Sequence, residues 1–77
     1  MVHAFVMIKT SATDIEPLQN TIENVGPVTQ AHIVAGDYDV IAQADADTVY
    51  NILDAAASGI RSIDGVVDTK TYIAIGD

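Results

Sequence analysis

The stretch IVAGDYDVIAQADAD (residues 33–47) joins two apolar runs through a glycine, two aspartates and a tyrosine. Gly36 and Asp37 have the chemistry of a tight turn, so the flanking apolar runs are predicted to pair as an antiparallel hairpin. Tyr38 and Asp39 are more than such a turn requires. Their presence makes the tip of the hairpin a candidate binding site.

Apolar spacing outside the hairpin predicts two further strands and two helices. Both alternating rows of residues 1–9 are largely apolar, which is typical of a central strand covered on both faces. Each predicted helix has one apolar stripe: Ile15, Leu18, Ile22 and Val25 in the first, and Val49, Ile52, Leu53, Ala56 and Ile60 in the second. The predicted strands are residues 1–9, 28–35, 38–44 and 66–75.

The helix ends have their own signals. Thr13 with Glu16 has the spacing of a capping box, although Pro17 favours a start between residues 14 and 16. Asp45 or Asp47 is predicted to cap the second helix.

The order β-α-β-β-α-β with right-handed crossovers predicts a ferredoxin-like α+β sandwich, with an antiparallel sheet in the order 4-1-3-2. Residues 1–77 are predicted to form a single domain. Two helices can cover only one face of this sheet, and the first strand carries apolar residues on the other. We therefore expect a homodimer that packs these open faces together, with Phe5 and Met7 at the interface.

Composition excludes several classes of function. The chain has 11 Asp and Glu against 3 Lys and Arg, a net charge of −8, so neither nucleic acid nor an anionic membrane is an expected partner. It has no cysteine, which excludes disulfides and thiolate metal sites. The acidic surface fits either a salt-loving source or ordinary solubility.

No catalytic, metal or cofactor site is predicted. His3 and His32 are the only histidines, and each is interpreted as a structural or interface residue. No glycine-rich phosphate loop opens a helix. The apolar N-terminal run lacks a basic leader and is too short to cross a bilayer, so we expect a mature cytoplasmic protein with nothing before its first strand.

The hairpin tip carries groups that suit a zwitterion such as an amino acid. Gly36 can adopt a positive φ and leaves backbone groups open to a ligand. Asp37 and Asp39 can hold an ammonium group, and Tyr38 offers an apolar wall with a polar tip. The alternative is an ordinary turn with solvated acids, because Gly-Asp turns are common.

Two segments, HIVAGDYDVIAQADAD (residues 32–47) and IRSIDGVVDTKTYIAI (residues 60–75), resemble the C-terminal effector domain of the leucine-responsive (Lrp/AsnC) regulators, also called the RAM domain. The resemblance covers essentially the whole chain. It implies a ferredoxin-like fold, dimers that pack through open sheet faces, further assembly into rings, and amino-acid effectors in clefts between neighbouring dimers. By position, it implies effector contacts from Gly36, Asp37, Tyr38 and Asp39, and from Thr69 and Thr71 of the last strand.

Full-length members of that family carry an N-terminal helix-turn-helix that these 77 residues lack, so the chain resembles the stand-alone RAM proteins. This resemblance implies a non-enzymatic sensor in transcription regulation or amino-acid metabolism. Such a sensor self-associates, can co-assemble with full-length regulators, and neither binds DNA directly nor needs a cofactor.

Two other functions fit the same predicted fold. One is a small dimeric enzyme similar to the cofactor-free monooxygenases. The other is an ACT-type amino-acid-binding domain, a family that places a glycine-containing ligand loop after its first strand. The corresponding segment here, KTSATD (residues 9–14), contains no glycine, which argues against the ACT alternative.

Overall fold

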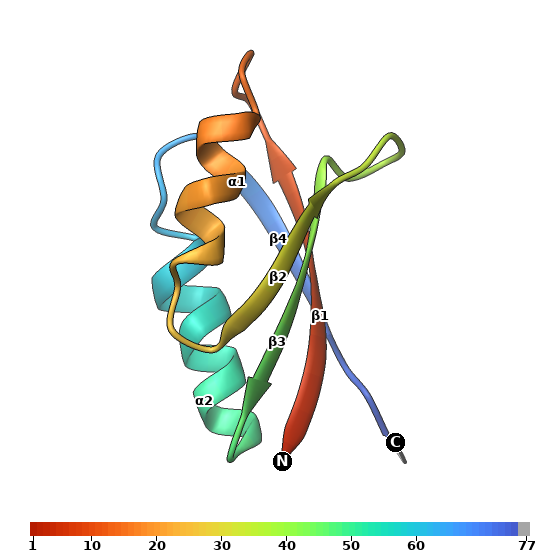
Figure 1. The fold of residues 1–77 in the computed structure, drawn as a ribbon, viewed down its shortest axis with the longest axis vertical. Helices are drawn as coiled ribbons and strands as arrows, with labels where there is room; N and C mark the ends of the chain where they lie inside the picture. The colour runs from red at the N-terminus through yellow and green to blue at the C-terminus, as the bar shows by residue number, and fades with distance from the viewer. Residues whose placement is uncertain (76–77) are drawn as a thin grey trace.

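The computed structural model describes residues 1–75, whose four strands form one antiparallel sheet in the order β2-β3-β1-β4 (Figure 1). This is the predicted order read from the opposite edge, so the predicted ferredoxin-like α+β fold is confirmed. The elements are β1 (Val2–Thr10), α1 (Glu16–Glu23), β2 (Val28–Ile33), β3 (Val40–Ala46), α2 (Val49–Asp54), the π-helical segment η1 (Ala55–Ile60) and β4 (Val66–Ile73).

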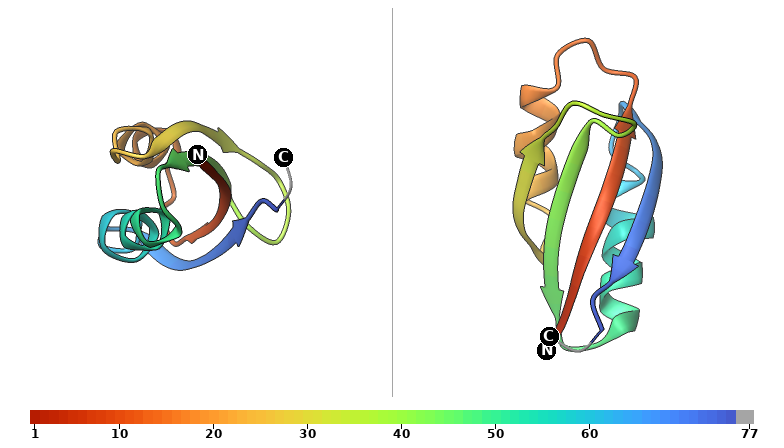
Figure 2. Two further views of the ribbon diagram at one scale, coloured as in Figure 1. Left: turned by 90° about the horizontal axis from the view of Figure 1, so that it is seen from below. Right: turned by 90° about the vertical axis from the view of Figure 1, so that its right-hand side faces the viewer.

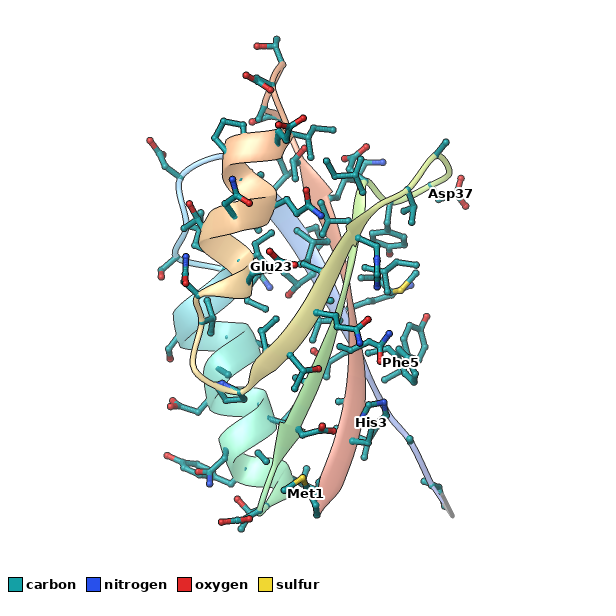
Figure 3. The ribbon with its side chains drawn as sticks, viewed as in Figure 1. Met1, His3, Phe5, Glu23 and Asp37 are labelled. Atoms are coloured by element: carbon teal, nitrogen blue, oxygen red, sulfur yellow. The ribbon has the colours of Figure 1, made fainter. Side chains whose placement is uncertain are left out.

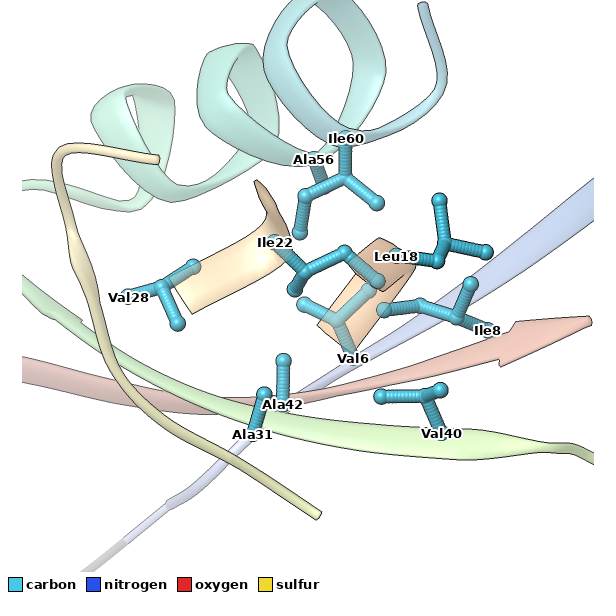
Figure 4. Packing of buried hydrophobic residues seen from close by; sticks show 10 residues of the cluster. All are labelled: Val6, Ile8, Leu18, Ile22, Val28, Ala31, Val40, Ala42, Ala56 and Ile60. Atoms are coloured by element: carbon cyan, nitrogen blue, oxygen red, sulfur yellow. The ribbon is translucent and has the colours of Figure 1, made fainter. Parts of the chain in front are cut away.

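Both helices lie on the same face of the sheet, and the opposite face has no cover within the described residues (Figure 2). The hydrophobic core fills the space between the helices and the sheet (Figure 4). Its largest fully buried side chains come from β1, β3 and the three helical segments: Val6, Ile8, Ile22, Val40, Ile52 and Ile60.

The alternation in β1 determines which residues enter this core. Ala4, Val6 and Ile8 are buried against the helices, whereas the intervening Phe5 is 38% exposed. β1 pairs with β3 on one side and β4 on the other, so it is the predicted central strand. Within residues 1–75, only the row of Ala4, Val6 and Ile8 is fully buried.

Alanines on the sheet allow α2 to approach closely. Ala4 of β1 is paired with Ala44 of β3, and both pack against Ile52 of α2 in a second, smaller buried cluster. Small side chains on a strand let a large side chain from the helix layer fill the space above them.

The predicted helix caps were wrong. At α1, Ile15 occupies the N-cap position without a side-chain hydrogen bond, so Thr13 and Glu16 form no capping box. Pro17 lies in the first turn, where a missing N–H costs no helical hydrogen bond. At α2 the cap is Thr48, whose Oγ1 accepts from Asn51 N at 3.1 Å, and neither predicted aspartate takes that role.

The second helix differs from a regular amphipathic helix. Its predicted stripe is only partly buried, because Val49 and Leu53 are 44% and 48% exposed. Its second half, η1, is π-helical, a form that is rare in proteins. Gly59 lies in this half, and a Cβ there would be 2.9 Å from Val25 Cγ1, so the glycine permits close packing against the turn that follows α1. No helix in residues 1–75 is long and apolar enough to cross a bilayer.

Gly65, in the turn before β4, has a φ of 99°, which side chains disfavour. We expect Gly65→Ala to lower the free energy of unfolding by about 1–2 kcal/mol through backbone strain. A Cβ there would meet Ala12 and Leu18 only at 3.8 Å or more, so steric overlap adds little. Urea denaturation at one fixed protein concentration measures this change.

Gly26→Ala is the matched control, because a Cβ at Gly26 meets nothing within 4 Å and its φ is not positive. Equal stability of the two variants would show that the conformation at Gly65 carries no strain.

Candidate functional site

The connection between β2 and β3 is longer than the predicted two-residue turn. β2 ends at Ile33 and β3 begins at Val40, which leaves six residues, 34–39, outside both strands. The loop is closed by a hydrogen bond from Val34 N to Asp39 O at 2.9 Å. The expected positive φ at Gly36 is absent, because Gly65 is the only residue with that conformation in the described part of the chain.

Asp39 holds the loop against the end of β1. Its carboxylate Oδ2 accepts from Thr10 N at 2.9 Å and from Thr10 Oγ1 at 3.4 Å. Its own N–H donates to Ile8 O at 2.9 Å. Asp39 therefore continues the pairing of β1 and β3 beyond their regular ladder. The sequence showed the carboxylate but not this anchoring role.

The carboxylate of Asp37 is free to contact a ligand, whereas that of Asp39 is hydrogen-bonded to Thr10. Its backbone carbonyl accepts from Lys9 Nζ at 2.8 Å, while its exposed carboxylate has no partner among residues 1–75. Figure 3 shows Asp37 at the tip of the loop, pointing away from the molecule. The loop leans over the end of β1, as Figure 2 (right) shows.

Lys9 and Thr10 were missed as contributors to this site. Lys9 was predicted only as the last residue of the first strand, residues 1–9, and Thr10 was placed outside that strand. The signal that could have identified Lys9 is its rarity, because the chain has only 3 Lys and Arg in total. A lysine at the end of a central strand is well placed to meet a loop that crosses that end.

Space around the loop is open. A Cβ at Gly36 would meet nothing within 4 Å, and Tyr38 is only partly buried. Two surface grooves, of about 660 and 450 Å³, are lined by residues of other segments and do not include residues 36–39. Within the described residues, neither groove offers a cavity at the loop.

Thr69 and Thr71 are not brought together with the loop. On β4 they are paired with Ile8 and Val6, in the partly buried row on the helix side of the sheet. β1 lies between β4 and β3, so these threonines are two strands away from residue 39.

The open face of the sheet is the main exposed apolar surface near the loop. Phe5 is paired with Tyr72 of β4, which is 54% exposed, and Met7 is paired with the partly buried Ile41 of β3. The His3 ring packs edge-on against Phe5, with ring centroids 5.1 Å apart at 89°. Figure 3 shows Phe5 and His3 pointing away from the helices.

Both histidines lie on strands and are hydrogen-bonded to neighbouring side chains. His3 Nδ1 is hydrogen-bonded to Asp45 Oδ1, and Asp45 lies within β3, three residues before the observed cap Thr48. His32 Nε2 lies 3.0 Å from Gln30 Oε1 on its own strand. In residues 1–75 no three His, Cys, Asp or Glu side chains are grouped so that they could hold a metal ion.

Comparison with known proteins agrees with this architecture. A family model for the Lrp/AsnC ligand binding domain matches residues 3–77. The structure of TTHA0845 from Thermus thermophilus is similar, with a TM-score of 0.92 and 30% identity over 100% of this chain and 96% of that one. FFRP-DM1 is similar with a TM-score of 0.88 and 29% identity, over 97% of this chain and 100% of that one. No curated protein matches the sequence.

Longer regulators share only the fold at this level of identity. The L-Met complex of transcriptional regulator NMB0573 from Neisseria meningitidis has a TM-score of 0.84 and 17% identity. That likeness covers 99% of this chain and 51% of the regulator, so the chain spans about half of that protein's length.

Proposed function

Because the chain belongs to the family of Lrp/AsnC ligand-binding domains, we propose that it is an amino-acid sensor whose output is its own assembly. The ligand binds at residues 36–39, between this chain and a neighbouring copy. Ligand binding then changes how copies associate, which is a coupling of two binding equilibria.

The observation that carries this proposal is that a lysine ammonium and an unpartnered carboxylate both lie at the loop. The Asp37 carboxylate is exposed and unpartnered among the described residues, and the Lys9 ammonium lies 2.8 Å from the carbonyl of the same residue. An α-amino acid carries an ammonium and a carboxylate a few ångströms apart. In our proposal Asp37 binds the ammonium, and Lys9, which keeps two further N–H groups, binds the carboxylate.

The structure modifies the division of roles between the two acids. Asp39 is occupied by Thr10, so in our proposal it shapes the loop, and Asp37 makes the charge contact. Tyr38 forms one wall. Thr69 and Thr71 stay weaker candidates, reached by the ligand only from a neighbouring copy. A site completed by a second copy agrees with the open space at the loop, where a Cβ on Gly36 would meet nothing within 4 Å.

The same family membership supports a homodimer through the open sheet face, with Phe5 and Met7 in the contact. The regulator of Neisseria meningitidis is complexed with L-Met, which supports an amino acid as the class of ligand. The described residues contain no helix-turn-helix, because β2 and β3 separate α1 from α2, which continues directly into η1. In our proposal the chain acts without contacting DNA itself, as a homo-oligomer or in assemblies with full-length regulators.

An enzymatic role has no support in the geometry. The family is a ligand-binding domain of regulators, and the two histidines are engaged with Asp45 and Gln30 on the sheet rather than placed beside the loop. We propose that the chain is not an enzyme.

A thermal-shift screen with the twenty amino acids, run together with light scattering, tests this function. The expected result is that one or a few amino acids raise the melting temperature and change the scattering mass at the same concentration. A screen in which no amino acid changes either quantity would contradict the proposed function.

A further inference from the structure

The groove of about 660 Å³ lies far from the ligand loop and takes no part in the function proposed above. Its lining comes mainly from the turn between α1 and β2, the end of β3, α2 and η1. Figure 3 shows Met1, one of its lining residues, at the opposite end of the molecule from Asp37. We call this groove, which runs along α2 and η1, the α2 groove.

One wall of the α2 groove is a row of polar side chains. Asp47 lies just before α2, and Asn51, Asp54 and Ser58 follow at intervals of four, three and four residues, the spacing of one side of a helix. All four residues are exposed. Within residues 1–75, the only hydrogen bond to either carboxylate is a long one, from Ser58 Oγ to Asp54 Oδ1 at 3.4 Å. Both carboxylates are therefore open to a ligand.

The facing wall of the α2 groove is apolar. Val25 and Pro27 come from the turn after α1, and Ala46 is the last residue of β3. The two walls meet at Gly59, where a Cβ would lie 2.9 Å from Val25 Cγ1. Gly59 belongs to the π-helical η1, and π-helical turns are frequent at functional sites. The groove thus sets hydrogen-bond acceptors opposite apolar side chains.

The negative charge of the α2 groove is not neutralised by the side chains around it. No Lys, Arg or His of residues 1–75 is among the residues that line it. Asp45 also lines the groove, but its carboxylate is hydrogen-bonded to His3, which leaves Asp47 and Asp54 as the open charges.

These two charges are too far apart for one small cation. Asp47 lies before the helix, and Val49 to Asp54 alone spans about 8 Å along the axis. In agreement, the described residues contain no group of three acids or histidines that could hold a metal ion. A complementary ligand therefore carries its positive charges at intervals along an apolar chain.

We propose that the α2 groove binds a linear polyamine, a chain of ammonium groups separated by methylene groups. Its end ammonium groups contact Asp47 and Asp54, and an ammonium group between them donates to the side-chain oxygen of Asn51. Its methylene groups lie against Val25 and Pro27. The site is separate from residues 36–39 and from the open face of the sheet.

A polyamine matches the α2 groove better than a basic peptide does. A polyamine has only N–H donors and methylene groups, and the groove offers acceptors on one wall and apolar atoms on the other. A peptide also brings one carbonyl per residue, and each buried carbonyl needs a donor. The only side-chain donors in the lining are the Asn51 amide and the Ser58 hydroxyl, and Ser58 already donates to Asp54.

Calorimetry with spermidine at low ionic strength tests this site in the intact protein. We expect the double variant Asp47→Asn with Asp54→Asn to bind spermidine about 10-fold more weakly, which is typical for loss of two exposed charge pairs. Asp14→Asn with Asp64→Asn is the matched control, because it removes the same charge from exposed residues of the other groove. This control should keep the wild-type affinity.

Two outcomes overturn the proposal. If wild type does not bind spermidine, the groove is not a polyamine site. If both double variants lose affinity equally, spermidine only neutralises the net charge of −8.

The apolar wall is tested without changing any charge. Ala55 lines the groove, so Ala55→Leu should displace about two methylene groups of the ligand and weaken spermidine binding roughly 10-fold. Ala57→Leu is the control, because Ala57 is exposed and does not line the groove. Circular dichroism shows whether both variants are folded. Equal spermidine affinity in folded Ala55→Leu and Ala57→Leu overturns the proposed position of the ligand.

This site and the proposed amino-acid site can fail separately. Asp37→Ala should leave spermidine binding unchanged, because the loop and the α2 groove lie at opposite ends of the molecule. A parallel loss of spermidine binding in Asp37→Ala overturns a polyamine site in the α2 groove.

Discussion

Phe5→Asp is expected to raise the dissociation constant of the face-to-face dimer by roughly 100- to 5,000-fold, because an unpaired carboxylate in an apolar contact costs about 3–5 kcal/mol. The chain itself should stay folded. Phe5 points away from the helices and is absent from the buried core, which is formed by the opposite row of β1. The change therefore acts on the surface between copies.

Sedimentation equilibrium over a range of protein concentrations measures this change, and circular dichroism shows whether the variant is folded. Phe5→Leu is the matched control, because it keeps an apolar side chain of similar reach and should dimerise almost as well as the wild type. If Phe5→Asp and wild type sediment identically, the open face is not the dimer contact. A variant that loses its secondary structure would also contradict the expectation that β1 is stabilised mainly from the helix side.

Asp37→Ala is expected to weaken binding of the cognate amino acid by about 10- to 100-fold, as expected for loss of one hydrogen bond to a charged group, about 1.5–3 kcal/mol. Gly36→Val should weaken binding further. A Cβ at Gly36 meets nothing within the described chain, and its φ is not positive, so the substitution leaves the fold unstrained. Any loss of binding then arises from the ligand or from the neighbouring copy.

Calorimetry with the amino acid selected by the thermal-shift screen measures both variants. Asp14→Ala removes one exposed carboxylate before α1 and controls for the change in net charge. Asp39→Ala is less informative, because loss of its bonds to Thr10 would loosen the loop even if the ligand never touches it. Unchanged affinity in folded Asp37→Ala and Gly36→Val would mean that residues 34–39 are a connection and not a binding site.

The fold was predictable because its signals are local. The alternation of side chains along β1 and the apolar stripe of α1 indicate which side of each element is apolar. The order of the elements, together with right-handed crossovers, then allows one order of strands in the sheet. The family resemblance rested on residues 32–47 and 60–75 and is confirmed over residues 3–77. By contrast, the helix caps and strand ends were predicted poorly, because several polar residues near each end compete for the same role.

The sequence by itself therefore determined the class of fold, the central position of β1, the presence of an open apolar face and the family. Only the tertiary structure decided what each acid of the loop does. Asp37 and Asp39 have the same chemistry and lie two residues apart, but Asp39 meets Thr10 of β1, while the Asp37 carboxylate points outward. Likewise, Gln19 and Glu23 look like ordinary polar residues of a helix until folding places them on the backbone of β2. These roles depend on contacts between residues far apart in the chain, and such contacts leave no periodic signal in the sequence.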